Sequence, residues 1–236
     1  MKNYGFTLAE VLITLGIIGV VSAITMPVLI NNFQEKVTIT RLKQAYSILS
    51  QAYTNITANE GSADTWNLEN ADKFRDLFAN YIKNVKKCDV QTDNCQPQAT
   101  KYLHSSGEAD YNNYKNHSNL IMNNGTLLTF YLNPARYDNT CSSNYGGIND
   151  GCKIAIHIDI NGKKEPNTWG KDRFEVMIYK NKILPAGHPD MTVTSFQNNC
   201  LKDSGEACTA WVIYNENLDY LKCPEILNWT GKTSCK

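Results

Sequence analysis

The longest apolar stretch of the chain lies close to its first residue. Residues 5–30 read GFTLAEVLITLGIIGVVSAITMPVLI, and Glu10 is the only charged residue among them. An α-helix rises about 1.5 Å per residue, so about 20 apolar residues cross the hydrocarbon core of a bilayer. The pattern therefore predicts a membrane-spanning helix that carries one carboxylate near its beginning.

This carboxylate needs a partner. A charged side chain inside a membrane helix costs at least about 2.5–3.5 kcal/mol, so such residues usually pair with another group and serve a function. Residues 6–30 contain no lysine, arginine or histidine that could pair with Glu10 from an adjacent helical turn. We therefore expect the cation that pairs with Glu10 to come from outside these turns.

The helical pattern continues beyond the apolar run as an amphipathic stripe. Gly61 offers a left-handed cap after its last turn, whereas Pro27 inside the apolar run is expected to kink or loosen the helix. The pattern predicts one long helix over residues 6–59. Apolar residues at spacings of three and four form the stripe: Leu42, Ala45, Leu49, Ala52 and Ile56.

After residue 60 the pattern predicts an α+β head. A second helix is expected over residues 70–86, and a polar loop over residues 88–119 follows it. Short runs with strand-like patterning predict strands at 126–132, 153–160, 173–180 and 182–184. Isoleucine at every second position from 154 to 160 predicts one buried face for the second of these strands. The tail is expected to add a strand at 210–214 and a short helix at 218–221.

Cysteine usage indicates an oxidising compartment. All eight cysteines lie after residue 87, and their even number is typical of a disulfide framework. Eight cysteines allow on the order of a hundred pairings. A zinc site is the alternative, but it requires close pairs such as CxxC, and no two cysteines here are nearer than seven positions. We expect four local pairs: Cys88 with Cys95, Cys141 with Cys152, Cys200 with Cys208, and Cys223 with Cys235.

Composition and motifs exclude several function classes. The 236 residues carry 23 basic and 23 acidic side chains, so no nucleic-acid footprint is evident, because such a footprint usually shows as a basic domain. The chain contains no GxSxG, HExxH, P-loop or GxGxxG motif, and its four histidines lack metal-ligand spacing. We therefore predict that the protein is not an enzyme, and an enzyme on a membrane anchor is the disfavoured alternative.

One loop of the head combines oxygen-bearing side chains with turn-forming glycines. A calcium site is one interpretation, because carboxylate and amide oxygens are the ligands that calcium prefers. An ordinary structural turn is the favoured one, because the spacing departs from an EF-hand and three lysines at 163, 164 and 171 oppose a cation. The sequence thus predicts no cofactor, with calcium as the open alternative. Its candidate ligands are Asp159, Asn161, Asn167 and Asp172.

The first ten residues resemble a known processing signal. Gly5, then Phe6-Thr7-Leu8, then Glu10 and an apolar helix are similar to the class III signal of type IV pilins and type II secretion pseudopilins. In that family a membrane peptidase cuts after the glycine and methylates the new amino terminus. The resemblance implies cleavage between Gly5 and Phe6, and an N-methylated Phe6 cation as the partner of Glu10.

The same resemblance implies a domain organisation. It gives a leader at 1–5, a transmembrane and filament-core helix at 6–30, an amphipathic continuation at 31–59, and a disulfide-rich head at 60–236. The family fold packs an antiparallel sheet against the upper half of the long helix. In this family the region around a proline at the position of Pro27 can unwind in assembled filaments, and some major pseudopilins hold calcium in a loop of the sheet.

Three other interpretations of the apolar run remain open. An ordinary secretory signal would be cut near Val21-Ser22-Ala23, although its hydrophobic region needs only about 7–15 residues. A plain single-pass anchor would leave Glu10 without a purpose. A buried core helix of a soluble enzyme would need burial on all sides.

The favoured function is that of a structural subunit, a pilin or pseudopilin. Its expected partners are other pilins or pseudopilins in a filament, the prepilin peptidase, and the bacterial inner membrane, with the head outside the cytoplasm. The alternative is a minor pilin that acts as a binding module for a surface, DNA or an exported protein. The residues do not choose between a pilus and a secretion system.

Overall fold

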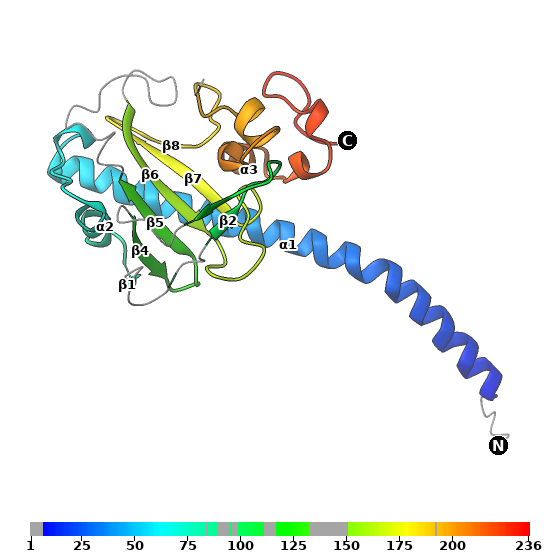
Figure 1. The fold of residues 1–236 in the computed structure, drawn as a ribbon. Coiled ribbons are helices and arrows are strands. Elements are labelled where there is room, and N and C mark those ends of the chain that lie inside the picture. Colours follow the sequence, from blue (N-terminus) through cyan, green and yellow to red (C-terminus); the bar gives the residue numbers. More distant parts are fainter. Residues whose placement is uncertain are drawn as a thin grey trace. The chain divides into compact units, whose positions relative to one another are not determined.

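The computed structural model describes residues 7–83, 85–88, 95, 99–110, 117–132, 151–191 and 193–236. It divides the chain into two compact units, Met1–Val37 and Thr38–Lys236. The long helix α1 (Leu8–Glu60) contributes its first part to one unit and its second part to the other. Figure 1 shows the elements of each unit.

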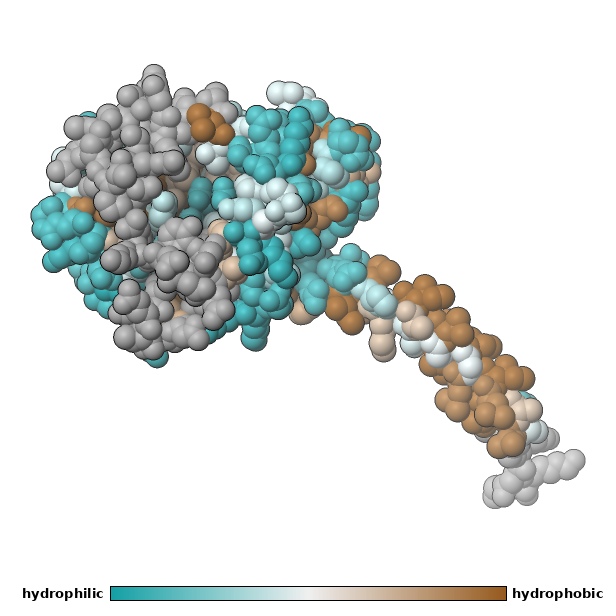
Figure 2. Space-filling model, in the orientation of Figure 1, coloured by the Kyte–Doolittle hydropathy of each residue, from teal (hydrophilic) through white to brown (hydrophobic). Residues whose placement is uncertain are grey.

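The first unit is the apolar part of α1. Its large side chains are exposed, from Leu8 at 80% to Phe33 at 67%, and Figure 2 shows this part of the helix as predominantly hydrophobic. By length and composition α1 is able to cross a membrane, with an 18-residue apolar window that has no buried residue. The helix is continuous through Pro27.

The second part of α1 belongs to the core of the head. The predicted stripe is confirmed, because all five of its residues are at most 1% exposed: Leu42, Ala45, Leu49, Ala52 and Ile56. Tyr53 lies beside them and donates a hydrogen bond of 2.9 Å to the carbonyl of Tyr179. After the helix ends, Gly61 has a φ of +86°, the left-handed conformation expected of a capping glycine.

A six-stranded antiparallel sheet forms the centre of the head, in the order β1-β4-β5-β6-β7-β8. A separate antiparallel pair joins β2 (Ala99–Lys101) to β3 (Glu108–Asp110). The central strands β5, β6 and β7 fall where the sequence predicts strands. The strands of the large sheet are β1 (Val85–Cys88), β4 (His117–Met122), β5 (Leu127–Leu132), β6 (Gly151–Asp159), β7 (Arg173–Tyr179) and β8 (Ile183–Pro185).

One face of this sheet packs against the helices. The four isoleucines of the 154–160 alternation share one buried cluster with the stripe of α1 and with Phe74 and Phe78 of α2 (Ala71–Ala79). Phe130 of β5 lies edge-on to Phe74, with 5.1 Å between ring centroids. Each Å² of apolar area that is buried contributes about 25 cal/mol of free energy. This layer is therefore the main source of stability of the head. The predicted α+β, pilin-like layout is confirmed.

Two predicted elements are wrong in part. The helix expected over 70–86 ends at Ala79, and Val85 begins β1 instead. The helical spacing of apolar residues extends to Ile82, which is also buried, but Ile82 lies in a turn after the helix. The loop expected over 88–119 contains β2, β3 and the first residues of β4 among its described residues.

The strand expected over 210–214 is a helix, α3 (Thr209–Asn215). Four consecutive residues of α3, Thr209 to Val212, are fully buried. A half-exposed strand would alternate between buried and exposed positions, whereas a short helix packed on more than one side buries consecutive residues. The short helix expected at 218–221 is confirmed as a 3-10 turn over Asp219–Leu221.

Candidate functional site

The first turn of α1 holds the Glu10 carboxylate in a reciprocal cap. Glu10 Oε2 accepts hydrogen bonds of 2.8 Å from both the backbone N–H and the hydroxyl of Thr7. The Thr7 hydroxyl oxygen in turn accepts the N–H of Glu10 at 3.2 Å. This is a capping box, in which a threonine before the helix and a glutamate three residues later satisfy each other's backbone donors.

Sequence reasoning missed this local partner. The adjacent turns contain no cation, so a partner from outside them is expected, whereas the structure shows a neutral partner, Thr7, in the first turn itself. The signal was present in the spacing of Thr7 and Glu10, which matches the capping-box pattern. Gly5 and Phe6, the residues of the expected cleavage site, lie outside the described residues.

The rest of the first unit supplies the features expected of a packing helix. Gly16 and Gly19 have no neighbouring atom within 4 Å of the position that a Cβ would take. Small residues of this kind let the backbones of two membrane helices approach closely. Pro27 lies eight residues after Gly19, inside the same exposed part of α1.

Three of the four expected disulfides are present. They join Cys88 to Cys95, Cys200 to Cys208, and Cys223 to Cys235, over sequence separations of 7, 8 and 12 residues. The fourth expected pair, Cys141 with Cys152, lies outside the described residues, apart from the backbone of Cys152 in β6.

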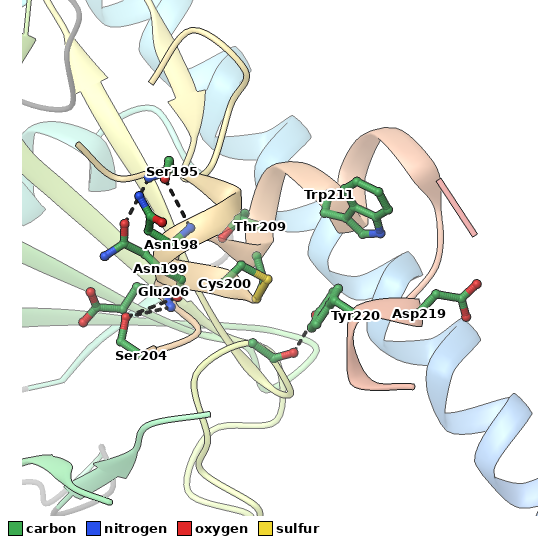
Figure 3. The surroundings of a disulfide bond; sticks show 12 residues. Ser195, Asn198, Asn199, Cys200, Ser204, Glu206, Thr209, Trp211, Asp219 and Tyr220 are labelled. Carbon is green, nitrogen blue, oxygen red and sulfur yellow. Dashed lines mark hydrogen bonds between the residues drawn. A yellow bond between two sulfur atoms is a disulfide. The ribbon is translucent and has the colours of Figure 1, made fainter. Parts of the chain in front are cut away.

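The Cys200–Cys208 bridge closes a local loop in the chain after β8, and its Cys208 packs against Gly170 of the loop between β6 and β7 (Figure 3). Both cysteines are fully buried. A Cβ on Gly170 would lie 3.0 Å from Cys208 Sγ, so this contact leaves no room for a side chain. Tyr220 donates a hydrogen bond to the carbonyl of the same glycine. The bridge thus tightens the packing of the 160–172 loop.

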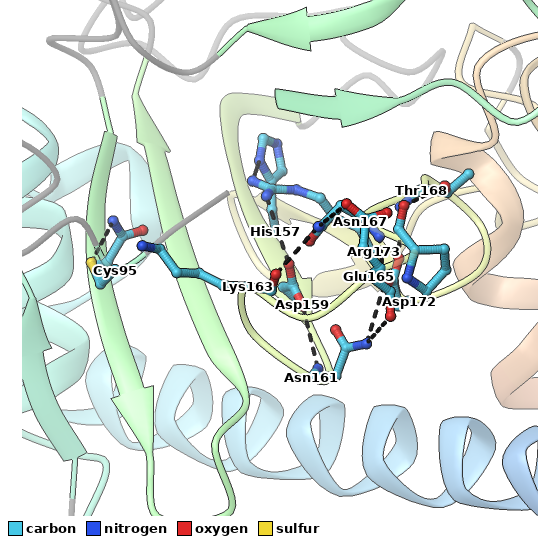
Figure 4. A network of polar contacts seen from close by, with 12 residues as sticks. Cys95, His157, Asp159, Asn161, Lys163, Glu165, Asn167, Thr168, Asp172 and Arg173 are labelled. Carbon is cyan, nitrogen blue, oxygen red and sulfur yellow. Dashed lines mark hydrogen bonds and ion pairs between the residues drawn. The ribbon is translucent and has the colours of Figure 1, made fainter. Parts of the chain in front are cut away.

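That loop is closed by Asp172. Its Oδ2 accepts the N–H of Asn167 at 2.8 Å, and its Oδ1 accepts the N–H of Thr168 at 2.7 Å (Figure 4). Asn161 donates its side-chain amide to Asp172 Oδ2 at 3.3 Å. Both carboxylate oxygens of Asp172 are therefore occupied by donors of the loop itself.

The four candidate calcium ligands lie together, joined by hydrogen bonds of Asn161 and Asn167 to the two carboxylates. Asp159 Oδ1 accepts the N–H of Asn161 at 3.3 Å, and its Oδ2 lies 4.0 Å from the guanidinium of Arg173. Asn161 Oδ1 and Asn167 Oδ1 are buried without a hydrogen-bond partner. Among the described residues no group of three or more His, Cys, Asp or Glu side chains could hold a metal ion.

A buried polar row crosses the opposite face of the sheet. His157 of β6 lies between two side chains of β7: Arg173 Nη2 donates to its Nδ1 at 3.3 Å, and its Nε2 lies 3.1 Å from Glu175 Oε2. Because arginine has no acceptor, His157 must be neutral, with its proton on Nε2. His157 faces away from the isoleucines because it alternates with them along β6, and its buried partners leave no local pattern in the sequence.

Burial shifts the pKa values of this row. It lowers the pKa of His157 well below its usual value, and the Arg173 charge acts in the same direction. Burial also raises the pKa of Glu175, and together with the nearby Glu175 charge it raises the pKa of Glu206 to about 7. Burial is again the main cause for Asp159, whose pKa rises to about 7 even though Arg173 opposes the shift. Next to this row, the backbone N–H of Glu175 donates a hydrogen bond of 2.9 Å to the hydroxyl of Thr209 in α3.

Comparison with known families assigns the two parts of the chain separately. A family model described as a family of unknown function, DUF6613, matches residues 28–217, which is most of the chain. The chain belongs to the DUF6613 family. Residues 1–26 match the prokaryotic N-terminal methylation motif, the prepilin-type cleavage and methylation signal. No curated protein and no solved structure matches the chain.

The methylation motif carries most of the functional meaning, because the DUF6613 family has no known function. Proteins with this motif are pilin-like substrates of a prepilin peptidase, and their role is structural rather than enzymatic. The motif implies assembly with other pilins, and the apolar α1 indicates a membrane-anchored precursor.

Proposed function

We propose that this DUF6613 protein is a structural subunit, a pilin or pseudopilin, of a type IV pilus-like or type II secretion filament. A prepilin peptidase cuts between Gly5 and Phe6 and methylates the Phe6 amino group. The subunit first resides in the bacterial inner membrane with its head outside the cytoplasm. The methylation motif over residues 1–26 is the observation that carries the proposal.

The geometry around Glu10 supports its role in assembly. Its carboxylate already binds the backbone nitrogen of Thr7, the residue directly after Phe6. Cleavage after Gly5 would place a cationic amino group one residue before this nitrogen. The carboxylate would then have a cation within its own first turn, and in a filament it would also be available to the amino terminus of a neighbouring subunit.

A pair of this kind acts as a register device, because a desolvated charge is costly to leave alone. Removing one partner of a buried ion pair costs about 3–5 kcal/mol. A subunit in which Glu10 does not meet an amino terminus would therefore be excluded from the packed helices. Pro27 and the small residues Gly16 and Gly19 would shape the same helix–helix contacts.

The protein needs no cofactor in this role, and we infer that the 160–172 loop keeps its shape without calcium. Both oxygens of Asp172 accept backbone N–H groups, and Arg173 lies beside Asp159. The exposed lysines at 163, 164 and 171 add further repulsion for a cation.

The Glu10 proposal is tested with two substitutions in cells that contain the complete assembly system. We expect Glu10→Ala and Glu10→Gln to be processed normally but to enter sheared filaments at least tenfold less than the unsubstituted chain, because about 1.4 kcal/mol already corresponds to a factor of ten. Glu10→Gln keeps a hydrogen-bond acceptor for Thr7 but lacks the charge, so it separates ion pairing from helix capping. Thr14→Val is the matched control within the same helix.

Normal incorporation of Glu10→Gln would contradict the pairing role and leave only the cap. The same filament preparation also distinguishes the alternative function. A structural subunit forms a large share of the filament mass, whereas a minor pilin that serves as a binding module for a surface, DNA or an exported protein is present in few copies.

A further inference from the structure

The loop between β6 and β7 carries an excess of exposed positive charge. Lys163, Lys164 and Lys171 are exposed, and the only exposed carboxylate of the loop, Glu165, lies 3.8 Å from Lys101 of β2. The remaining acidic side chain, Asp172, is buried and engaged by backbone amides. In a chain whose basic and acidic residues balance, the exposed charges of this loop are three lysines and one glutamate.

The backbone that carries these lysines is held by hydrogen bonds and packing within the loop. Asn167 is buried, and its side-chain amide donates to the carbonyl of Lys163 at 3.3 Å (Figure 4). The neighbouring residues Thr168 and Trp169 are buried as well. The Asp172 hydrogen bonds and the Cys200–Cys208 contact at Gly170 therefore fix the backbone from which the exposed lysines project.

The loop is attached to α1 only a few residues along the chain from the apolar run. Arg41 of α1 donates a hydrogen bond of 3.0 Å to the carbonyl of Ile160, where the loop begins. Only eight residues separate Arg41 from Phe33, the last large exposed apolar residue of α1. Eight helical residues rise about 12 Å along a helix, so the chain between the last exposed apolar residue and the attachment point of the loop is short.

We propose that Lys163, Lys164 and Lys171 bind anionic lipid headgroups while the subunit is anchored in the bilayer, before it enters a filament. Basic residues next to a membrane segment are attracted to anionic lipids, and the attraction acts within about a Debye length of the surface. The contact would hold the head at the bilayer surface. It rests on the membrane-anchored stage of the proposed function.

Hydrogen–deuterium exchange of the full chain in nanodiscs tests this contact. The nanodiscs contain either phosphatidylcholine alone or phosphatidylcholine with phosphatidylglycerol. With the anionic lipid, we expect amides 161–165 to exchange about fivefold more slowly, the factor that corresponds to one basic residue near an anionic surface. High salt should remove this difference, because the attraction between exposed charges is screened.

Two variants sharpen the result. The triple variant Lys163→Gln, Lys164→Gln, Lys171→Gln is expected to lose the lipid dependence. The control variant Lys180→Gln, Lys182→Gln also removes lysines, but at the other end of β7, and is expected to keep it. Lys180 is exposed, and Asp64, its partner in an ion pair, is partly exposed, so we expect the control to lose little stability.

Equal exchange in the two lipid compositions, or lipid dependence that survives in the triple variant, would overturn the proposal. The proposal would also be overturned if the slower amide exchange required a second protein and not the anionic lipid. Failure of the chain to integrate into either nanodisc would instead contradict the membrane-anchored stage. The two proposals therefore fail in distinguishable ways.

Discussion

The Glu10 carboxylate has one partner in the uncut chain and, in our proposal, a second partner after cleavage. Thr7 satisfies the Glu10 carboxylate in the uncut chain, and the proposed Phe6 amino terminus would be its next partner after cleavage. The need of Glu10 for a partner could be predicted from its place in an apolar run. The identity of the first partner does not follow from charge, because Thr7 is neutral and pairs with Glu10 through backbone capping.

Asp172 allows a direct test of what holds the loop between β6 and β7. Asp172→Asn replaces one of two accepting oxygens with an NH₂ group that faces a backbone N–H. We expect a loss of about 1–3 kcal/mol in the free energy of unfolding, the usual cost of an unsatisfied buried donor. Chemical denaturation of the detergent-solubilised full chain measures it, and Asp203→Asn, at an exposed aspartate, is the control.

The same preparation distinguishes hydrogen bonding from calcium. We expect the melting temperature to be unchanged by millimolar calcium in both the unsubstituted chain and Asp172→Asn. A calcium-dependent rise that Asp159→Ala abolishes would contradict this account and establish a cation site at the loop.

Among the helices and strands, those that bury one face at regular intervals could be predicted from the sequence. The α1 stripe and the central strands β5, β6 and β7 were predictable, because each buries one face against the same core. α3 was not, because its consecutive buried residues from Thr209 to Val212 resemble a strand when their neighbours are unknown. β1 and β4 were missed, because their identification depends on pairing with each other and with β5 rather than on a local pattern.

The contact between β7 and the turn before α3 predicts a pH dependence. The pKa of Glu206 in the folded head is raised to about 7 by burial and by Glu175, whereas the unfolded value is near 4.5. Its stabilising contribution is therefore complete below about pH 4.5 and is lost as the pH rises through 7. Glu206→Gln mimics the protonated form, so it should stabilise the head at pH 8.5 by about 1–3 kcal/mol and change little at pH 5.

Urea denaturation of the full chain in detergent at the two pH values checks this prediction. Glu225→Gln, at an exposed glutamate, should have the same small effect at both. The pKa of His157 is lowered, so its contribution has the opposite sign and is lost as the pH falls below about 6.5. Equal stability of Glu206→Gln and the unsubstituted chain at pH 8.5 would show that Glu206 ionises without cost.

In the whole molecule, the function of the first part of the chain can be inferred from its sequence, and the function of the second part cannot. The first carries a processing signal that its own residues reveal, since a carboxylate at the start of an apolar helix is costly unless it serves a function. The second is a DUF6613 head whose fold is determined by its core and three described disulfides. Its specific task could not be predicted, because a binding surface has no periodic pattern in the sequence.

The central claim is that the chain is matured as a filament subunit, and the mass of its amino-terminal peptide tests it most directly. The chain is recovered from cells that contain a prepilin peptidase and from cells that lack it. We predict that the matured chain begins at Phe6 and carries one added methyl group, and that the leader 1–5 remains when the peptidase is absent. A chain that keeps its leader in both cells, or is cut after Ala23 as an ordinary secretory signal would be, would contradict the account.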